Sequence, residues 1–63
     1  MNNIKLNGLY KHYKNGNLYT VVDFCKIQVN DVWIDAVIYT DSRSKYVRDV
    51  KEFMGKFSKV RYG

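Results

Sequence analysis

The pattern of apolar and polar positions predicts short β-strands along most of the chain. Leu9 to Lys14 is expected as a first strand and Leu18 to Val29 as a second. The dipeptide Asn15-Gly16 between them is the strongest short-range signal for a β-hairpin, because a type I′ turn needs positive φ at both central residues. A two-residue loop at this point would pair His12 with Tyr19 across the hairpin.

Apolar residues occupy both faces of the second strand, and also of a third expected strand, Val32 to Thr40. A sheet with one wet face would alternate cleanly between apolar and polar positions. The pattern therefore favours a sheet whose second face is covered, either within a curled barrel or by a second subunit. The period of two places four residues on one face of the hairpin: Tyr10, His12, Tyr19 and Val21. Along the second strand, it places Leu18, Val22 and Phe24 on one face and Tyr19, Val21, Cys25 and Ile27 on the other.

The second half of the chain adds turns, a helical turn and two more strands. Asp49 is a good N-cap for a helical turn that reaches Met54, with Glu52 at the capping-box spacing and Gly55 as its terminator. The other expected elements are turns at Asn30-Asp31 and Asp41 to Ser44, and strands over Lys45 to Arg48 and Lys56 to Tyr62.

The expected fold is therefore all-β. It is a small antiparallel meander, curled into an SH3-like, partly open barrel, with one short helical turn before the last strand. Residues 1–63 form one domain, which at this length buries only about 60% of the surface that the unfolded chain exposes. Cys25 and His12 are the only residues of their kinds, so an internal disulfide and a four-ligand zinc site are both excluded. Small domains that lack both are commonly stabilised by a partner subunit, and we expect a homodimer.

The chain has neither the apolar segment of a signal peptide nor the roughly 18–20 apolar residues of a transmembrane helix. A lone cysteine suits a reducing compartment. A cytoplasmic protein without membrane contact is expected.

No group of residues is typical of a catalytic site, and we expect a protein that is not an enzyme and needs no cofactor or metal. In the register above, Cys25 lies about 20 Å along the strand from the partner of His12, too far for a nucleophile and its base. Cys25 is interpreted as a small buried apolar residue. His12 is interpreted as a packing residue of the hairpin or a surface ring stacked beside Tyr10. Asp23 and Asp35 fall within strands, where they either face solvent or pair with a cation such as Arg48.

The charge balance is basic, with eleven Lys and Arg against six Asp and Glu and a formal net charge of +5. Positive charge favours encounter with nucleic acid, anionic lipid or an acidic protein, and it also keeps a small domain soluble. Six Tyr, three Phe and one Trp are many for this length. Exposed aromatic side chains favour interfaces, including stacking on bases.

From Gly8 onward, a set of residues stands in a recognisable order: Gly8, Tyr10, His12, Tyr13, Lys14, Tyr19 and Val21, then Asp35 with Val37-Ile38-Tyr39, Tyr46-Val47-Arg48 and Phe53. In this order and rough spacing, the chain resembles the "domain of unknown function 1653" family of small bacterial and phage proteins. The resemblance departs from the family where Cys25 to Asp31 replaces a His-Ser-Glu-Thr segment, where Tyr46 replaces a Trp and where Asp49 replaces a Pro. It implies a small curled β-sheet, and it implies no chemistry, because the family has no assigned function.

Three binding functions remain open. The first is a protein-interaction module, of the kind that phages encode to inhibit host defence proteins. The second is nucleic-acid binding by a basic face with tyrosine platforms, and the third is capture of an anionic small molecule, such as a nucleotide, between the subunits of a dimer. The candidate binding residues are Tyr10, Lys11, His12, Tyr13, Lys14, Trp33, Tyr46 and Arg48.

Overall fold

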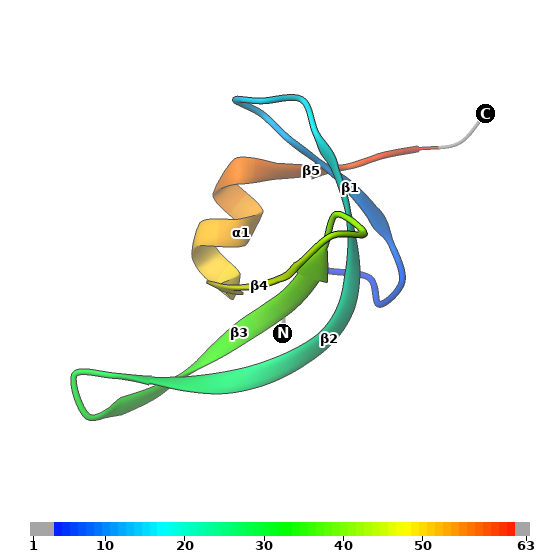
Figure 1. The fold of residues 1–63 in the computed structure, drawn as a ribbon. Helices are drawn as coiled ribbons and strands as arrows, with labels where there is room; N and C mark the ends of the chain where they lie inside the picture. The colour runs from blue at the N-terminus through cyan, green and yellow to red at the C-terminus, as the bar shows by residue number, and fades with distance from the viewer. Residues whose placement is uncertain (1–3, 62–63) are drawn as a thin grey trace.

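Five strands pair into one antiparallel sheet in the computed structural model, which describes residues 4–61 (Figure 1). The strand order is β4-β3-β2-β1-β5, so the edge strands are the last two in the sequence, and a helix joins them. The sheet curls without closing, and the expected SH3-like, partly open barrel is confirmed. The elements are β1 (Leu9–His12), β2 (Leu18–Val29), β3 (Val32–Thr40), β4 (Lys45–Asp49), α1 (Val50–Lys56) and β5 (Phe57–Lys59).

The core lies between α1 and the face of the sheet that carries Val21 and Val37. Phe53 of α1 is 1% exposed, and its ring stacks on Phe57 with 4.1 Å between the ring centroids. The rings of Tyr10 and Tyr39 each approach Phe53 at 5.2 Å. Burying one large apolar side chain contributes about 1.5–3 kcal/mol. A single helix with one central phenylalanine therefore supplies much of the stability of this short chain.

The β1–β2 hairpin forms where it was predicted, but its register is wrong by two residues. Tyr10, not His12, pairs with Tyr19. The backbone N–H of His12 donates to Asn17 O at 3.0 Å, so residues 13–16 form a loop of four residues instead of two. As a result the first strand ends at His12 instead of Lys14.

The cause lies in the dipeptide that suggested the shorter loop. Of the two residues of the dipeptide, only Gly16 has positive φ, at 71°, so the two-residue type I′ turn does not form. Asn15 uses its side-chain oxygen instead, and accepts the backbone N–H of Asn17 at 2.8 Å. A shift of two residues leaves each side chain on its predicted face, because the strand period is two.

The β2–β3 hairpin has the ends and the turn that the sequence predicted. Asn30 and Asp31 have φ of 50° and 65°, as a type I′ turn requires, and Val29 pairs with Val32 across it. A β-bulge interrupts the ladder between Val21 and Asp23.

This bulge makes the predicted faces of β2 wrong beyond Val22. Val21 pairs with Tyr39, whereas Phe24 pairs with the fully buried Val37, so the two β2 side chains share the core face. Cys25 is half-buried on the opposite face, paired with Ala36.

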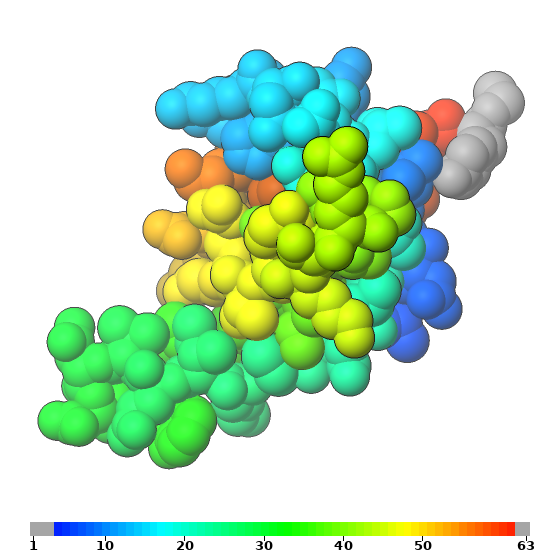
Figure 2. All heavy atoms as spheres, viewed as in Figure 1, coloured from blue at the N-terminus to red at the C-terminus, as the bar shows by residue number. Residues whose placement is uncertain are grey.

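The outer part of the β2–β3 hairpin, residues 26–35, forms a two-stranded arm that extends away from the barrel (Figures 1 and 2). Among the described residues, β1 pairs with β2 only up to Thr20, and β4 pairs with β3 only from Ala36. No third strand therefore reaches the arm. The arm accounts for the elongated shape, with principal extents of 42 × 26 × 21 Å.

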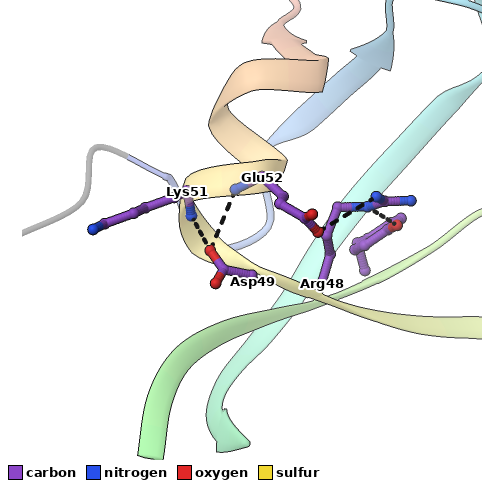
Figure 3. Close-up of polar contacts among 5 residues, drawn as sticks. Arg48, Asp49, Lys51 and Glu52 are labelled. Carbon is purple, nitrogen blue, oxygen red and sulfur yellow. Dashed lines mark hydrogen bonds and ion pairs between the residues drawn. The ribbon is translucent and has the colours of Figure 1, made fainter. Parts of the chain in front are cut away.

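Helix α1 begins as the sequence predicted and ends differently. The Asp49 carboxylate accepts the backbone N–H groups of Lys51 at 2.6 Å and Glu52 at 3.3 Å (Figure 3). The helix continues through Gly55, so the prediction of Gly55 as its terminator is wrong. It ends instead where Phe57 adopts an extended conformation and pairs directly with His12 of β1.

The segment before β1 does not extend that strand. Ile4 is buried, and the backbone N–H of Lys5 donates to the Tyr10 hydroxyl at 2.9 Å. A turn then leads to Gly8, where an added Cβ would lie 2.9 Å from the Lys5 carbonyl oxygen. Residues 1–3, and Tyr62 of the predicted last strand, lie outside the described residues.

Candidate functional site

The predicted binding residues lie in four different places. Trp33 is on the arm, and Tyr10 is in the core at 6% exposed. The suggestion of Tyr10 as a stacking platform is therefore wrong, because its hydroxyl and ring are both occupied within the fold. The others separate into an exposed group on the β1–β2 hairpin, Lys11, Tyr13 and Lys14, and a group that meets at a hollow of the barrel, His12, Tyr46 and Arg48.

This hollow, the aromatic cup, has a volume of about 180 Å³ and draws on all five strands and the first loop. Its rings meet mostly edge to face: Tyr39 lies 5.4 Å from Tyr19 and 5.1 Å from Phe57 between centroids. Such contacts hold aromatic side chains in fixed orientations. The cup is lined by His12, Asn15, Tyr19, Tyr39, Tyr46, Arg48 and Phe57.

Among residues 4–61, Arg48 is the one Lys or Arg that lines the cup, and its side chain is 31% exposed. Its Nε donates to the Tyr39 hydroxyl at 3.1 Å. Its Nη1 lies 4.0 Å from a carboxylate oxygen of Glu52 (Figure 3). The Tyr39 hydroxyl, more than any other neighbour, raises the pKa of Arg48. Neither strand aspartate uses this arginine: both are exposed, and Asp35 pairs with Lys26 at 3.0 Å.

His12 is fixed on three sides. Its Nδ1 accepts the backbone N–H of Lys14 at 3.1 Å. Its ring stacks on Tyr13 at 5.4 Å and meets Phe57 edge-on at 4.8 Å. Because Nδ1 is an acceptor, the neutral imidazole carries its hydrogen on Nε2. The predicted packing role of His12 fits these contacts.

Tyr46 is fixed at the rim of the cup by the β3–β4 turn. Its hydroxyl donates to the Asp41 carboxylate at 2.9 Å, and this bond raises the pKa of Tyr46. The backbone N–H groups of Arg43 and Ser44, followed by the Tyr46 hydroxyl, lower the pKa of Asp41. Asp41 is therefore committed to its own turn.

A second hollow, the arm groove, lies between the arm and α1. Its volume is about 520 Å³, within the range of about 300–1,000 Å³ that is usual for ligand pockets. Trp33 of the arm is 62% exposed, and Met54 of α1 is 49% exposed. The groove is lined by Lys26, Trp33, Ile34 and Asp35 from the arm, and by Asp49, Val50, Lys51 and Met54 from the end of β4 and α1.

Sequence reasoning missed several lining residues. Tyr39 and Phe57 line the cup, and Met54 lines the arm groove together with Trp33. The period of two already placed Tyr19 on the face that holds His12, which is a usable signal. Nothing in the sequence brings the fourth and fifth strands to the first, because that depends on how far the sheet curls.

Comparisons with protein families, with curated proteins and with solved structures find no match for this chain. The resemblance to the "domain of unknown function 1653" family stays an expectation. Among residues 4–61, no helix is long and apolar enough to cross a membrane. Within the same range, no group of three or more His, Cys, Asp or Glu residues is placed to hold a metal ion.

Proposed function

We propose that this protein is a non-enzymatic binding module that takes up an extended segment of a partner protein as an added strand beside β3. The observation that carries the proposal is the edge of β3 at residues 32–35, which no strand among the described residues covers. Strand addition at an open sheet edge is a recurrent mode of peptide recognition. Here the chain turns away into α1 directly after Asp49, and thus leaves the position beside the arm vacant.

The backbone of β3 has the groups that such a strand needs. In a two-residue hairpin the residues that flank the turn bond to each other, which directs the N–H and C=O of Val32 toward Val29. Backbone groups alternate along an antiparallel strand, so those of Trp33 and Asp35 face away from β2. Val37 follows the same alternation and pairs with Arg48 of β4. A partner strand would continue the ladder that β4 begins.

The arm groove favours particular side chains on the partner. Trp33, Ile34, Val50 and Met54 offer apolar surface that an alternating apolar residue of the added strand would cover. Of the charged residues that line the groove, Lys26 and Asp35 form an ion pair and the Asp49 carboxylate caps α1. The ammonium group of Lys51 is the charge that these contacts do not neutralise. We expect a segment of about four residues with apolar side chains at alternate positions and an acidic residue near Lys51.

A display library of random linear peptides tests this proposal. Peptides selected on the wild-type protein are measured by calorimetry against Asp35→Pro, which removes one outward N–H group without interrupting the ladder to β2. We expect about tenfold weaker binding, since one hydrogen bond contributes about 0.5–1.5 kcal/mol and tenfold corresponds to about 1.4 kcal/mol. Asp35→Ala, which loses the ion pair but keeps the N–H, should bind like the wild type.

Gln28→Pro is the matched control at the opposite edge of the arm. Gln28 pairs with Trp33, and its backbone groups face away from β3 and away from the proposed strand. Peptide binding should survive this substitution. If Gln28→Pro abolishes binding and Asp35→Pro does not, or if no alternating apolar peptide is enriched, strand addition beside β3 is refuted.

Nucleic-acid binding is the second candidate, and one local observation favours it. Lys11, Tyr13 and Lys14 are all exposed on the β1–β2 hairpin, with Tyr13 at 61%. Two cations beside an exposed ring suit a single strand, and binding would weaken steeply with salt because counterions are released. Fluorescence anisotropy with a labelled oligothymidine at two salt concentrations tests this. The double reversal Lys11→Glu with Lys14→Glu should abolish binding, and unchanged binding contradicts it.

The homodimer, the cytoplasmic location and the inhibition of a host defence protein stay predictions. A homodimer is compatible with strand addition, because a second copy could supply the added strand. Sedimentation of the wild type and of Asp35→Pro distinguishes this case: a dimer that dissociates only in the proline variant would identify the partner as a second copy of this chain.

A further inference from the structure

We infer that the aromatic cup is a second binding site, separate from the arm groove, and that it takes the oxyanion group of a small organic acid, a carboxylate or a phosphate monoester. The cup presents hydrogen-bond donors from four strands and one loop to a single hollow. Most acceptors nearby are already used within the fold. The inference does not depend on the proposed function, because no residue lines both hollows.

Two of the three tyrosine hydroxyls of the cup, those of Tyr19 and Tyr39, are already hydrogen-bond acceptors. Tyr39 accepts from Arg48 Nε at 3.1 Å, and Tyr19 accepts from Asn15 Nδ2 at 3.5 Å. A hydroxyl that accepts in this way still has its own hydrogen to donate. Among the described residues, the Tyr19 and Tyr39 hydroxyls take part in side-chain hydrogen bonds only as acceptors. Both are therefore available to a bound acceptor.

Three further donors border the same space. Arg48 uses Nε for Tyr39, which leaves its terminal nitrogens with only the 4.0 Å approach of Glu52. His12 carries its hydrogen on Nε2, because Nδ1 accepts from Lys14. Asn15 contributes its amide. A group with several acceptor oxygens and a negative charge satisfies such a set, and arginine favours carboxylates and phosphates in particular.

The acidic residues near the cup do not fill this role. Asp41 accepts from two backbone N–H groups of its turn and from Tyr46, so both of its carboxylate oxygens already have donors within the fold. Glu52 has a 62% exposed side chain and meets Arg48 only at the 4.0 Å limit. A surface ion pair of this kind contributes little, about 0–1 kcal/mol, and a ligand can displace it.

Size and lining further restrict the ligand. A hollow of about 180 Å³ holds roughly six water molecules at about 30 Å³ each, enough for an acid group and a few more atoms. It is smaller than the roughly 300 Å³ at which pockets for whole drug-sized ligands begin. The rings of Tyr19, Tyr46 and Phe57 offer faces and edges beside the donors. The preferred ligand is thus an acid joined to a planar group.

NMR titration with matched small probes tests this inference. Phenyl phosphate and benzoate carry both the acid and the ring, benzamide carries only the ring, and inorganic phosphate and acetate carry only the acid. We expect phenyl phosphate or benzoate to shift the ring signals of His12 and Tyr19 in a saturable way. Benzamide should bind at least about tenfold more weakly. The ratio of the affinities for phenyl phosphate and benzoate distinguishes a phosphate site from a carboxylate site. The affinities for inorganic phosphate and acetate show how much the ring contributes to binding.

Two variants identify the site, and each has a control. Arg48→Gln should weaken binding at least tenfold, whereas Arg43→Gln removes the same charge from the β3–β4 turn outside the cup and should not. Because Arg48 also supports Tyr39, Asn15→Asp provides a second route: it keeps the side-chain oxygen that accepts from Asn17 and replaces the amide donor with a negative charge. Equal binding by benzamide, or unchanged binding in a folded Arg48→Gln or Asn15→Asp variant, overturns the inference.

Discussion

The barrel and the arm are built from the same two strands and differ in what covers them. In the barrel, β2 and β3 have paired neighbours on both sides, and Val21 and Val37 are fully buried against α1. In the arm, the same strands pair only with each other, and Val29, Val32 and Trp33 are 45–62% exposed. A two-stranded hairpin by itself is marginally stable in water. The arm therefore depends on the barrel, while the barrel owes little to the arm.

This difference separates folding from binding within one short chain. Apolar side chains in the barrel stabilise the fold because they leave water on folding. Those of the arm remain in water until a partner covers them, so their burial is available to binding. Trp33 and Met54, both exposed, line the arm groove, and exposed apolar surface of this kind commonly marks an interaction site. Four predictions test the separation, beginning with the largest expected effect.

The sharpest test replaces one aromatic residue in each region. Phe53→Ala in the barrel should cost about 3–5 kcal/mol, comparable to the roughly 3–5 kcal/mol that a core of this size supplies, so the variant should be largely unfolded. Trp33→Ala in the arm should change the free energy of unfolding by less than about 0.5 kcal/mol. Urea denaturation followed by circular dichroism measures both. A similar loss in both variants would mean that the arm belongs to the folding unit.

The helix cap is the next largest effect, because α1 closes the core. Asp49→Ala leaves the N–H groups of Lys51 and Glu52 without their acceptor, and should cost about 1 kcal/mol in the free energy of unfolding. Asp49→Asn keeps an acceptor oxygen and should retain most of that stability. Denaturation midpoints compare the two variants. Equal losses from both substitutions would assign the effect to charge instead of the cap.

The β3–β4 turn should give the barrel a stability term that depends on pH. The folded pKa of Asp41 is lowered, foremost by the N–H of Arg43, so its contribution is present above the unfolded pKa and is lost as pH falls through the folded value. Asp41→Asn should remove this acid-range loss. Tyr46→Phe should remove only part of it, since the backbone bonds are the larger causes. Urea unfolding across the acid range measures the slopes, and identical slopes in wild type and Asp41→Asn contradict the prediction.

The smallest effect is expected at the ion pair of the arm. Lys26 and Asp35 lie 3.0 Å apart, with side chains 68% and 70% exposed. A double-mutant cycle with Lys26→Ala and Asp35→Ala should give a coupling below about 0.5 kcal/mol, because solvent screens exposed pairs. A larger coupling would indicate that the arm contributes its own stability, which would weaken its contrast with the barrel.

Local chemistry in the sequence determined several elements directly. Asn30-Asp31 tolerates positive φ at both positions, and this sets the turn of the long hairpin and the register of its outer part. Asp49 ahead of a short apolar run sets the start of α1. In these cases the deciding interactions lie within a few residues along the chain, where a pattern can predict them.

Other features were decided by contacts between distant segments. Gly16 and Asn15 fit two loop lengths, and the pairing of His12 with Phe57 of the last strand accompanies the longer one. The bulge at Val22 follows no local signal, yet it determines which side chains of β2 reach the core. Tyr10 and Trp33 appear equally suited to a binding site in the sequence, and only the curl of the sheet buries the first and exposes the second.

The sequence by itself thus determined the strands, the long hairpin and the helix cap, because turn dihedrals and capping bonds are local. The tertiary structure alone decided the two candidate sites. The cup exists because the curl of the sheet brings Tyr39 and Arg48 beside His12. The arm groove exists because β4 pairs with β3 only from Ala36 and the chain then continues directly into α1, which leaves the outer part of β3 without a neighbour on that side. Both depend on how far the sheet bends and where pairing stops, and these follow from the summed packing of residues far apart in the chain.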